Sequence, residues 1–97
     1  MTMAARGYAK LIEEMGELTQ VAGKRLAYYT TDDHPDGGPP LRERLVNEMG
    51  DVIAAINFVA EQEDLDWSQV IMRSIDKKRV YEQWHAEAHN NVDAVDG

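Results

Sequence analysis

The sequence contains no cysteine among its 97 residues. Disulfide bonds, thiolate metal sites and a thiol nucleophile are therefore excluded. No apolar run approaches the roughly 20 residues that a membrane-spanning helix needs. The opening residues, MTMAARGYAK, lack the apolar stretch of a signal peptide. We therefore expect a soluble, cytoplasmic protein with no membrane partner.

Basic residues are also scarce. The chain has 10 Lys and Arg against 18 Asp and Glu, which gives a net charge of −8 at pH 7. A surface that binds a nucleic-acid polymer needs clustered Lys and Arg, so we expect no such partner. The excess of carboxylates is compatible with a site for divalent cations. A helical chain of this length often completes its core by oligomerising.

No strand pattern competes with the helical periodicity of the sequence. Apolar residues three and four positions apart predict one amphipathic helix over about residues 3–28. A second such helix is predicted to begin at Pro40 or Leu41 and to end near Gln62. Between the two, residues 30–40 (TTDDHPDGGPP) are rich in turn formers and predict a loop.

A third helix is predicted after a short break. Asp66, with Gln69 three positions later, resembles a capping box, and the helix is expected to run to about Ala88. The polar residues 90–97 predict a disordered tail. The fold prediction is an all-α bundle of about three main helices, forming a single domain over residues 1–89 that is completed by oligomerisation.

One eight-residue phrase occurs twice, 34 positions apart, as LIEEMGEL from residue 11 and as LVNEMGDV from residue 45. Each copy carries two carboxylates three residues apart: Glu14 with Glu17, and Glu48 with Asp51. Residues at i and i+3 lie on the same face of a helix, one turn apart. Two such helices packed side by side would therefore bring four carboxylates together.

The direction of these acids follows from the apolar stripe of each helix. In the first helix that stripe comprises Leu11, Met15, Leu18 and Ala22. At about 100° per residue, Glu14 lies about 60° and Glu17 about 120° from the centre of the stripe, so both flank the core. Glu48 and Asp51 hold the same offsets in the second helix, whereas Glu13 points well away from the stripe.

A glycine occupies the same slot of each phrase, Gly16 and Gly50. A glycine in mid-helix costs about 1 kcal/mol relative to alanine. The repetition suggests that helices approach closely there, although two surface glycines would give the same pattern.

Four carboxylates in one place are ligands that suit Mg²⁺ or Mn²⁺, whereas the lack of His or Cys suits Zn²⁺ or Cu²⁺ poorly. A glutamate on the flank of a helix is usually just solvated. Here, however, two pairs of acids lie at the same angles from the apolar stripes of their two helices. This agreement favours a cation site instead. Without a cation the four acids would repel one another, so a bound cation should stabilise the fold.

The segments EEMGEL and NEMGDV resemble the all-α nucleoside triphosphate pyrophosphohydrolases of the MazG-like group, which includes dimeric dUTPases and dCTPases. The signature of that group is EExxE on one helix and ExxD on the next. The residues that match it are Glu13, Glu14, Glu17, Glu48 and Asp51. The resemblance covers about residues 8–82 of the chain.

The resemblance implies that Glu14, Glu17, Glu48 and Asp51 ligate Mg²⁺ ions, with Mn²⁺ as a substitute, that bridge the phosphates of a nucleoside triphosphate. Water would attack the α-phosphorus and release a nucleoside monophosphate and pyrophosphate, as in the house-cleaning of nucleotide pools. Glu13 would support the ligands or act as the base. The sequence does not distinguish among the possible bases and sugars.

The resemblance also implies basic residues that hold phosphate. The candidates are Lys77 and Lys78 on the third helix and Lys24 on the first, and Asn57 is a candidate for a hydrogen bond to a base edge. Several relatives have a complete helix before the EExxE helix. This chain has only a few turns there, so we expect a homodimer or a homotetramer.

Three alternatives remain open. Phosphoribosyl-ATP pyrophosphohydrolase has a related helical fold, but its usual glycine- and arginine-rich context is not evident. A di-iron carboxylate bundle needs two ExxH motifs, and this chain offers one, at Glu82 and His85. The third alternative is a non-catalytic, acidic helical module that oligomerises and binds structural cations.

Overall fold

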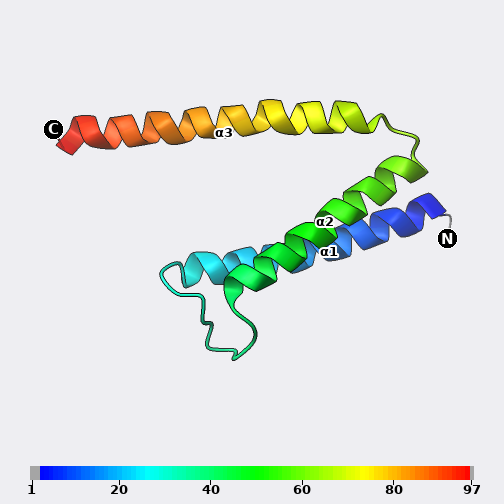
Figure 1. Ribbon diagram of the computed structural model, residues 1–97, viewed down its shortest axis with the longest axis horizontal. Helices are drawn as coiled ribbons and strands as arrows, with labels where there is room; N and C mark the ends of the chain where they lie inside the picture. The colour runs from blue at the N-terminus through cyan, green and yellow to red at the C-terminus, as the bar shows by residue number, and fades with distance from the viewer. Residues whose placement is uncertain (1–2, 97) are drawn as a thin grey trace. The chain divides into compact units, whose positions relative to one another are not determined.

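The computed structural model describes the backbone of residues 3–96 and the side chains of residues 5–90. Three helices make up this part of the chain: α1 (Met3–Ala27), α2 (Leu41–Gln62) and α3 (Trp67–Asp96) (Figure 1). The described residues contain no strand, which confirms the all-α prediction. None of these helices is both long and apolar enough to cross a membrane.

The helix starts follow local chemistry. Pro40, with φ −53° and ψ 142°, directly precedes α2, and the Leu41 amide donates to the Asp32 carbonyl at 2.7 Å. Before α3, the Asp66 carboxylate accepts hydrogen bonds from the Ser68 amide (2.9 Å) and from the Ser68 hydroxyl (2.6 Å). Both starts were predicted from sequence, because proline favours the first turn and aspartate caps it.

The end of the third helix differs from the prediction. Residues 90–97 were expected to form a disordered tail after a helix ending near Ala88, whereas α3 is helical to Asp96. The physical reason is that no strong helix breaker interrupts this segment: proline is absent and glycine comes only at the last position.

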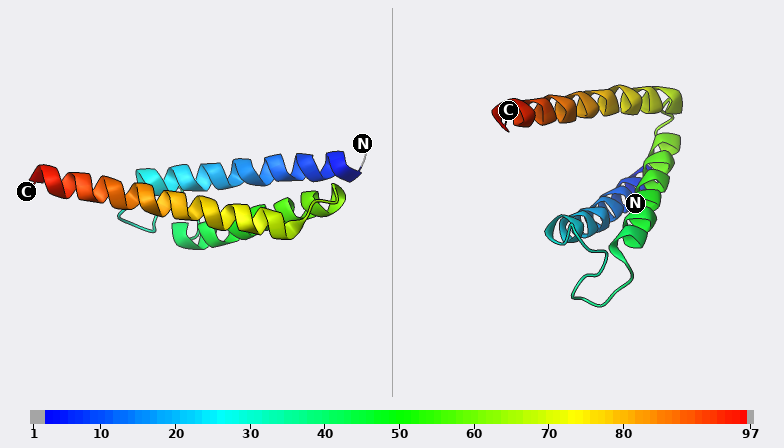
Figure 2. Two further views of the ribbon diagram at one scale, coloured as in Figure 1. Left: turned by 90° about the horizontal axis from the view of Figure 1, so that it is seen from above. Right: turned by 60° about the vertical axis from the view of Figure 1, so that its left-hand side comes forward.

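The chain divides into two units after Leu65. The first unit is an antiparallel hairpin in which α1 and α2 pack along each other (Figures 1 and 2). The second unit consists of α3. The single domain over residues 1–89 and its completion by oligomerisation stay predictions.

The contact between α1 and α2 follows a four-three spacing on both helices. The more buried positions of α1 are Gly7, Leu11, Glu14, Leu18 and Val21. The corresponding positions of α2 are Leu41, Leu45, Glu48, Val52 and Ala55. Each position of the second set lies 34 residues after its counterpart in the first, so the sequence repeat is also a structural repeat. We call this contact the seam.

The seam corrects the predicted direction of the acids. Glu14 was expected about 60° off the core, but it lies within the seam and is only 7% exposed. Met15 was expected in the apolar stripe, yet it is 51% exposed, and Met49 is 50% exposed. The reason is that each helix carries two adjacent apolar strips. Periodicity alone does not determine which strip packs in the hairpin.

Several ion pairs of the loop between α1 and α2 meet at one residue, Asp36. The Asp36 carboxylate accepts two hydrogen bonds from the Arg44 guanidinium (2.8 and 2.9 Å) and one from the Lys24 ammonium (2.9 Å). Arg44 Nε also donates to the Pro39 carbonyl at 2.6 Å. These contacts hold the pKa of Asp36 far below its ordinary value of 3.8, with Arg44 as the first cause and Lys24 as the second. The loop therefore ties the end of α1 to the start of α2.

The repeated glycines do not mark a close approach within the chain. A Cβ added at Gly16 or Gly50 would meet nothing within 4 Å. The close approach occurs instead at Gly7, where a Cβ would lie 3.2 Å from Phe58 Cδ1 and 3.4 Å from Val59 Cγ2.

This contrast gives a test by alanine substitution. Gly16→Ala is expected to raise the free energy of unfolding by about 0.5–1 kcal/mol, because alanine favours the helix and has room there. Gly7→Ala should raise the free energy of unfolding by less than this, or lower it, because the added methyl group crowds Phe58. Urea denaturation measures both. Destabilisation by Gly16→Ala would contradict an open face and indicate that a second molecule packs against it.

Candidate cation site

Four carboxylates meet near the middle of the hairpin. Glu14 and Glu17 come from α1, and Glu48 and Asp51 come from α2. One carboxylate oxygen from each residue lies within 4.8 Å of those of the other three. The two phrases therefore lie opposite each other across the seam. We call these residues the acidic cluster.

The four acids differ in burial. Glu14 is buried, Glu48 is half-buried, and Glu17 and Asp51 are exposed. The Oε2 atoms of Glu14 and Glu48 are both buried and have no hydrogen-bond partner. A buried carboxylate oxygen without a partner is costly, and a cation or a donor normally offsets that cost. A cation held by the cluster would supply the partner that these two oxygens lack.

The donor set limits the kind of cation. All four groups are carboxylates, and the cluster holds no histidine nitrogen or sulfur ligand. Oxygen donors of this kind suit hard divalent cations such as Mg²⁺, Mn²⁺ or Ca²⁺. The residues present thus fit the type of metal that the sequence resemblance implies, without selecting one member of that class.

Like-charge repulsion acts within the cluster. The Glu14 carboxylate raises the pKa of Glu17 above its ordinary value of 4.5, and burial and the charge of Glu48 raise it further. An acid beside other acids holds its proton more tightly, because ionisation places another negative charge among them. The cluster is therefore electrostatically strained in the absence of a cation.

Sequence reasoning missed one contact of the cluster. The Lys10 ammonium lies 3.3 Å from Glu14 Oε1 and 3.5 Å from Glu13 Oε2. Lys10 precedes these acids by four and three residues, which is the spacing of ion pairs along a helix. That spacing was a signal in the sequence, and it would have identified Lys10 as a neighbour of the cluster.

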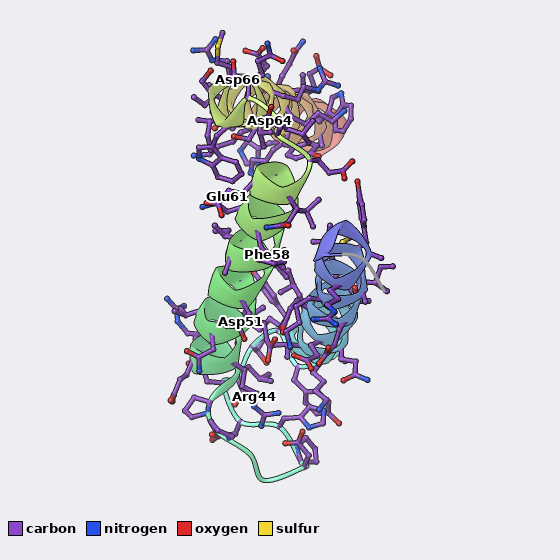
Figure 3. All side chains as sticks on the ribbon, turned by 90° about the vertical axis from the view of Figure 1, so that its right-hand side faces the viewer. Arg44, Asp51, Phe58, Glu61, Asp64 and Asp66 are labelled. Carbon is purple, nitrogen blue, oxygen red and sulfur yellow. The ribbon has the colours of Figure 1, made fainter. Side chains whose placement is uncertain are left out.

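A cavity of about 410 Å³ adjoins the cluster on α1 and α2. Its lining residues are Lys10, Glu14, Asp51, Ala54, Ala55 and Phe58. Asp51 and Phe58 both belong to α2 (Figure 3), and their spacing of seven residues corresponds to about two helical turns. The cavity thus has carboxylates and an ammonium at one end and apolar side chains at the other.

The other predicted site residues lie outside the cluster. Glu13 is exposed, as expected, and pairs with Lys10. Lys24, predicted to hold phosphate, forms an ion pair with Asp36 of the loop. Asn57 is exposed on α2.

Lys77 and Lys78 belong to α3, in the second unit. The Lys77 ammonium lies 5.8 Å from the ring centroids of Tyr81 and Trp84. Lys78 Nζ lies 3.9 Å from a Glu82 oxygen. Their proposed contact with phosphate stays a prediction.

Comparisons with models of protein families, with curated proteins and with solved structures each found no match to this chain.

The repulsion in the cluster predicts the pH dependence of stability in EDTA. Because the pKa of Glu17 is raised in the folded state, the folded protein binds this proton more tightly than the unfolded chain does. The free energy of unfolding should rise as the pH falls from 7 through the folded-state pKa, and this gain should be complete near pH 4.5.

Two other acids act in the opposite direction at lower pH. The pKa values of Asp36 and Asp66 are lowered from 3.8, so the stability that these acids contribute is lost as the pH falls below that value. Thermal melts from pH 7 to 3 should therefore show a maximum. Glu17→Gln is the control and should reduce the rise between pH 7 and 4.5. A melting temperature that falls throughout this range would contradict a raised pKa of Glu17 in the folded state.

Proposed function

We propose that this protein is a Mg²⁺-dependent nucleoside triphosphate pyrophosphohydrolase. The observation that carries the proposal is the convergence of Glu14, Glu17, Glu48 and Asp51, with two buried oxygens that lack a partner. The same residues form the EExxE and ExxD pattern that resembles the MazG-like group. Geometry and pattern thus select the same four side chains.

The four carboxylates would hold Mg²⁺, with Mn²⁺ as a substitute. A cation bound there would supply neutralisation of phosphate charge and a lowered pKa for a coordinated water. A protein with a net charge of −8 repels a triphosphate, so the acidic cluster is suited to binding nucleotide only together with cations.

The proposed reaction is hydrolysis at the α-phosphorus. A bond forms between the water oxygen and the α-phosphorus, and the bond from the α-phosphorus to the oxygen bridging the α- and β-phosphates breaks. Pyrophosphate leaves with that electron pair, and a carboxylate accepts the proton lost by the water. Glu13 is the candidate base because it adjoins Glu14 in sequence and its Oε2 lies 3.5 Å from the Lys10 ammonium, which also contacts Glu14.

A homodimer or homotetramer is part of this proposal. Several large apolar side chains of the hairpin are exposed on the strip beside the seam. They are Tyr8, Ile12, Met15, Leu26, Val46, Met49 and Ile53. A monomer rarely exposes so many apolar side chains along one strip, and a second copy of the chain would bury them.

Two other functions are consistent with the cluster. A phosphoribosyl-ATP pyrophosphohydrolase would use the same carboxylates on a different substrate. A non-catalytic module with a structural cation is favoured by the burial of Glu14, because a buried oxygen benefits from a cation whether or not a reaction follows.

The test is turnover of a nucleotide panel with Mg²⁺, followed by chromatography of the products. The panel contains the common ribo- and deoxyribonucleoside triphosphates and phosphoribosyl-ATP. We expect a monophosphate and pyrophosphate as products. Glu48→Gln and Asp51→Asn should each lower kcat/KM at least about 100-fold, because each removes a cation ligand. Glu43→Gln is the matched control, since it neutralises an exposed acid in the first turn of α2.

The other outcomes separate the alternatives. Diphosphate and inorganic phosphate as products would place the reaction at the γ-phosphorus and contradict the proposal. Turnover of phosphoribosyl-ATP alone would assign the enzyme to the first alternative. No turnover, with Mn²⁺ still raising the melting temperature, would favour the structural module. A cation at about 100 times its Kd stabilises a folded protein by about 2.7 kcal/mol.

A further inference from the structure

Among the described residues, Lys10 is the basic side chain that contacts the buried acid of the cluster, Glu14. Its ammonium lies 3.3 Å from Glu14 Oε1, while Glu14 Oε2 is buried without a partner. The Lys10 side chain itself is 56% exposed. The ion pair thus joins a buried carboxylate to a side chain that is free to leave for solvent.

A divalent cation at the cluster would compete with this ion pair. Glu14 is a member of the acidic cluster, so a cation held by the cluster binds the carboxylate that Lys10 neutralises. A monovalent and a divalent cation on one carboxylate repel each other strongly at separations of a few ångströms. The ammonium has to move away when the divalent cation binds.

The cavity beside the cluster provides a place for the displaced ammonium. Lys10 lines this cavity of about 410 Å³ together with Glu14, Asp51 and Phe58. A ligand with an anionic group at the cluster and an apolar part near Phe58 would match both ends of the cavity. The anionic group would then lie within reach of the displaced ammonium.

We propose that Lys10 is the resident counter-ion of Glu14, that a divalent cation at the cluster displaces it, and that the displaced ammonium contacts the phosphate of a ligand in the adjoining cavity. This inference rests on the proposed function for the class of ligand, a phosphate ester or anhydride. Its first step, the replacement of the Lys10 ammonium by a divalent cation at Glu14, depends only on the acidic cluster and not on the proposed reaction.

The first test measures Mn²⁺ affinity without any nucleotide, from the electron paramagnetic resonance signal of free Mn²⁺. Lys10→Met removes the charge and keeps an unbranched side chain. We expect it to bind Mn²⁺ about three- to fivefold more tightly, because its competitor for Glu14 is gone. Lys10→Arg retains the charge and should stay within about twofold of the native protein. Unchanged or weaker Mn²⁺ binding by Lys10→Met would overturn the exchange.

Arg42→Gln is the matched control for net charge. Arg42 is exposed in α2 and lies about 9 Å along the helix axis from Glu48, because it precedes Glu48 by six positions. Its removal changes the charge of the protein by the same amount and should alter the Mn²⁺ affinity less than Lys10→Met does. If Lys10→Met is unfolded in EDTA, Lys10→Gln, which also lacks the charge, takes its place in the same titration. Tighter Mn²⁺ binding by that variant supports the exchange, and unchanged or weaker binding overturns it.

The second test uses pyrophosphate as the probe, with Mg²⁺ in excess and calorimetry as the readout. Lys10→Met should bind pyrophosphate at least about fivefold more weakly than the native protein, whereas Arg42→Gln should change this affinity by less than about twofold. Equal pyrophosphate affinity in native protein and Lys10→Met would overturn the phosphate contact. Both tests are independent of turnover, so the exchange can hold even where no nucleotide is hydrolysed, and hydrolysis can occur where the exchange fails.

Discussion

The constraint on which the rest of the structure depends is the carboxylate of Glu14 inside the seam between α1 and α2. Burying a negative charge opposite Glu48 opposes the packing of the two helices. Three features offset this cost: the apolar seam residues on both sides, the ion pair with Lys10 at 3.3 Å, and the loop contacts of Asp36 that join the helix ends. The hairpin therefore holds its acids together, although they repel one another.

The repeat explains how two short phrases produce one cluster. In an antiparallel hairpin, a local two-fold axis can relate equivalent positions of two similar helices, and only the positions near that axis, here Glu14 and Glu48, lie opposite each other. The exposures agree with this relation, since Ile12 and Val46 are 72% and 71% exposed, and Met15 and Met49 are 51% and 50% exposed. Each phrase thus supplies one seam acid and one exposed acid. The repeat differs at the ends, where the seam of α1 begins with Gly7 and that of α2 with the fully buried Leu41.

Much of the fold was predictable from sequence, because proline, glycine and capping residues act locally. The starts of α2 and α3 and the loop at 30–40 are of this kind. The rotation of each helix was not predictable, because two adjacent apolar strips have the same periodicity. For this reason Glu14 was predicted to flank the core, whereas it lies within the seam. The sequence nonetheless predicted which four acids form the cluster. Two acids three residues apart share one face of a helix, whichever apolar strip packs in the seam. The contacts of Asp36 depend on the path of the loop, which no local rule specifies.

The burial of the four acids bears on whether a cation there would be structural or catalytic. A structural metal site is normally closed by protein ligands, whereas a catalytic site keeps positions open for water and substrate. Here Glu14 and Glu48 are the less exposed pair, and Glu17 and Asp51 are the exposed pair. One acid of each pair, Glu14 and Asp51, also lines the adjoining cavity. A cation held by the cluster would thus have less exposed carboxylates among its ligands and room for a ligand beside it, which is compatible with the proposed hydrolysis of a bound phosphate.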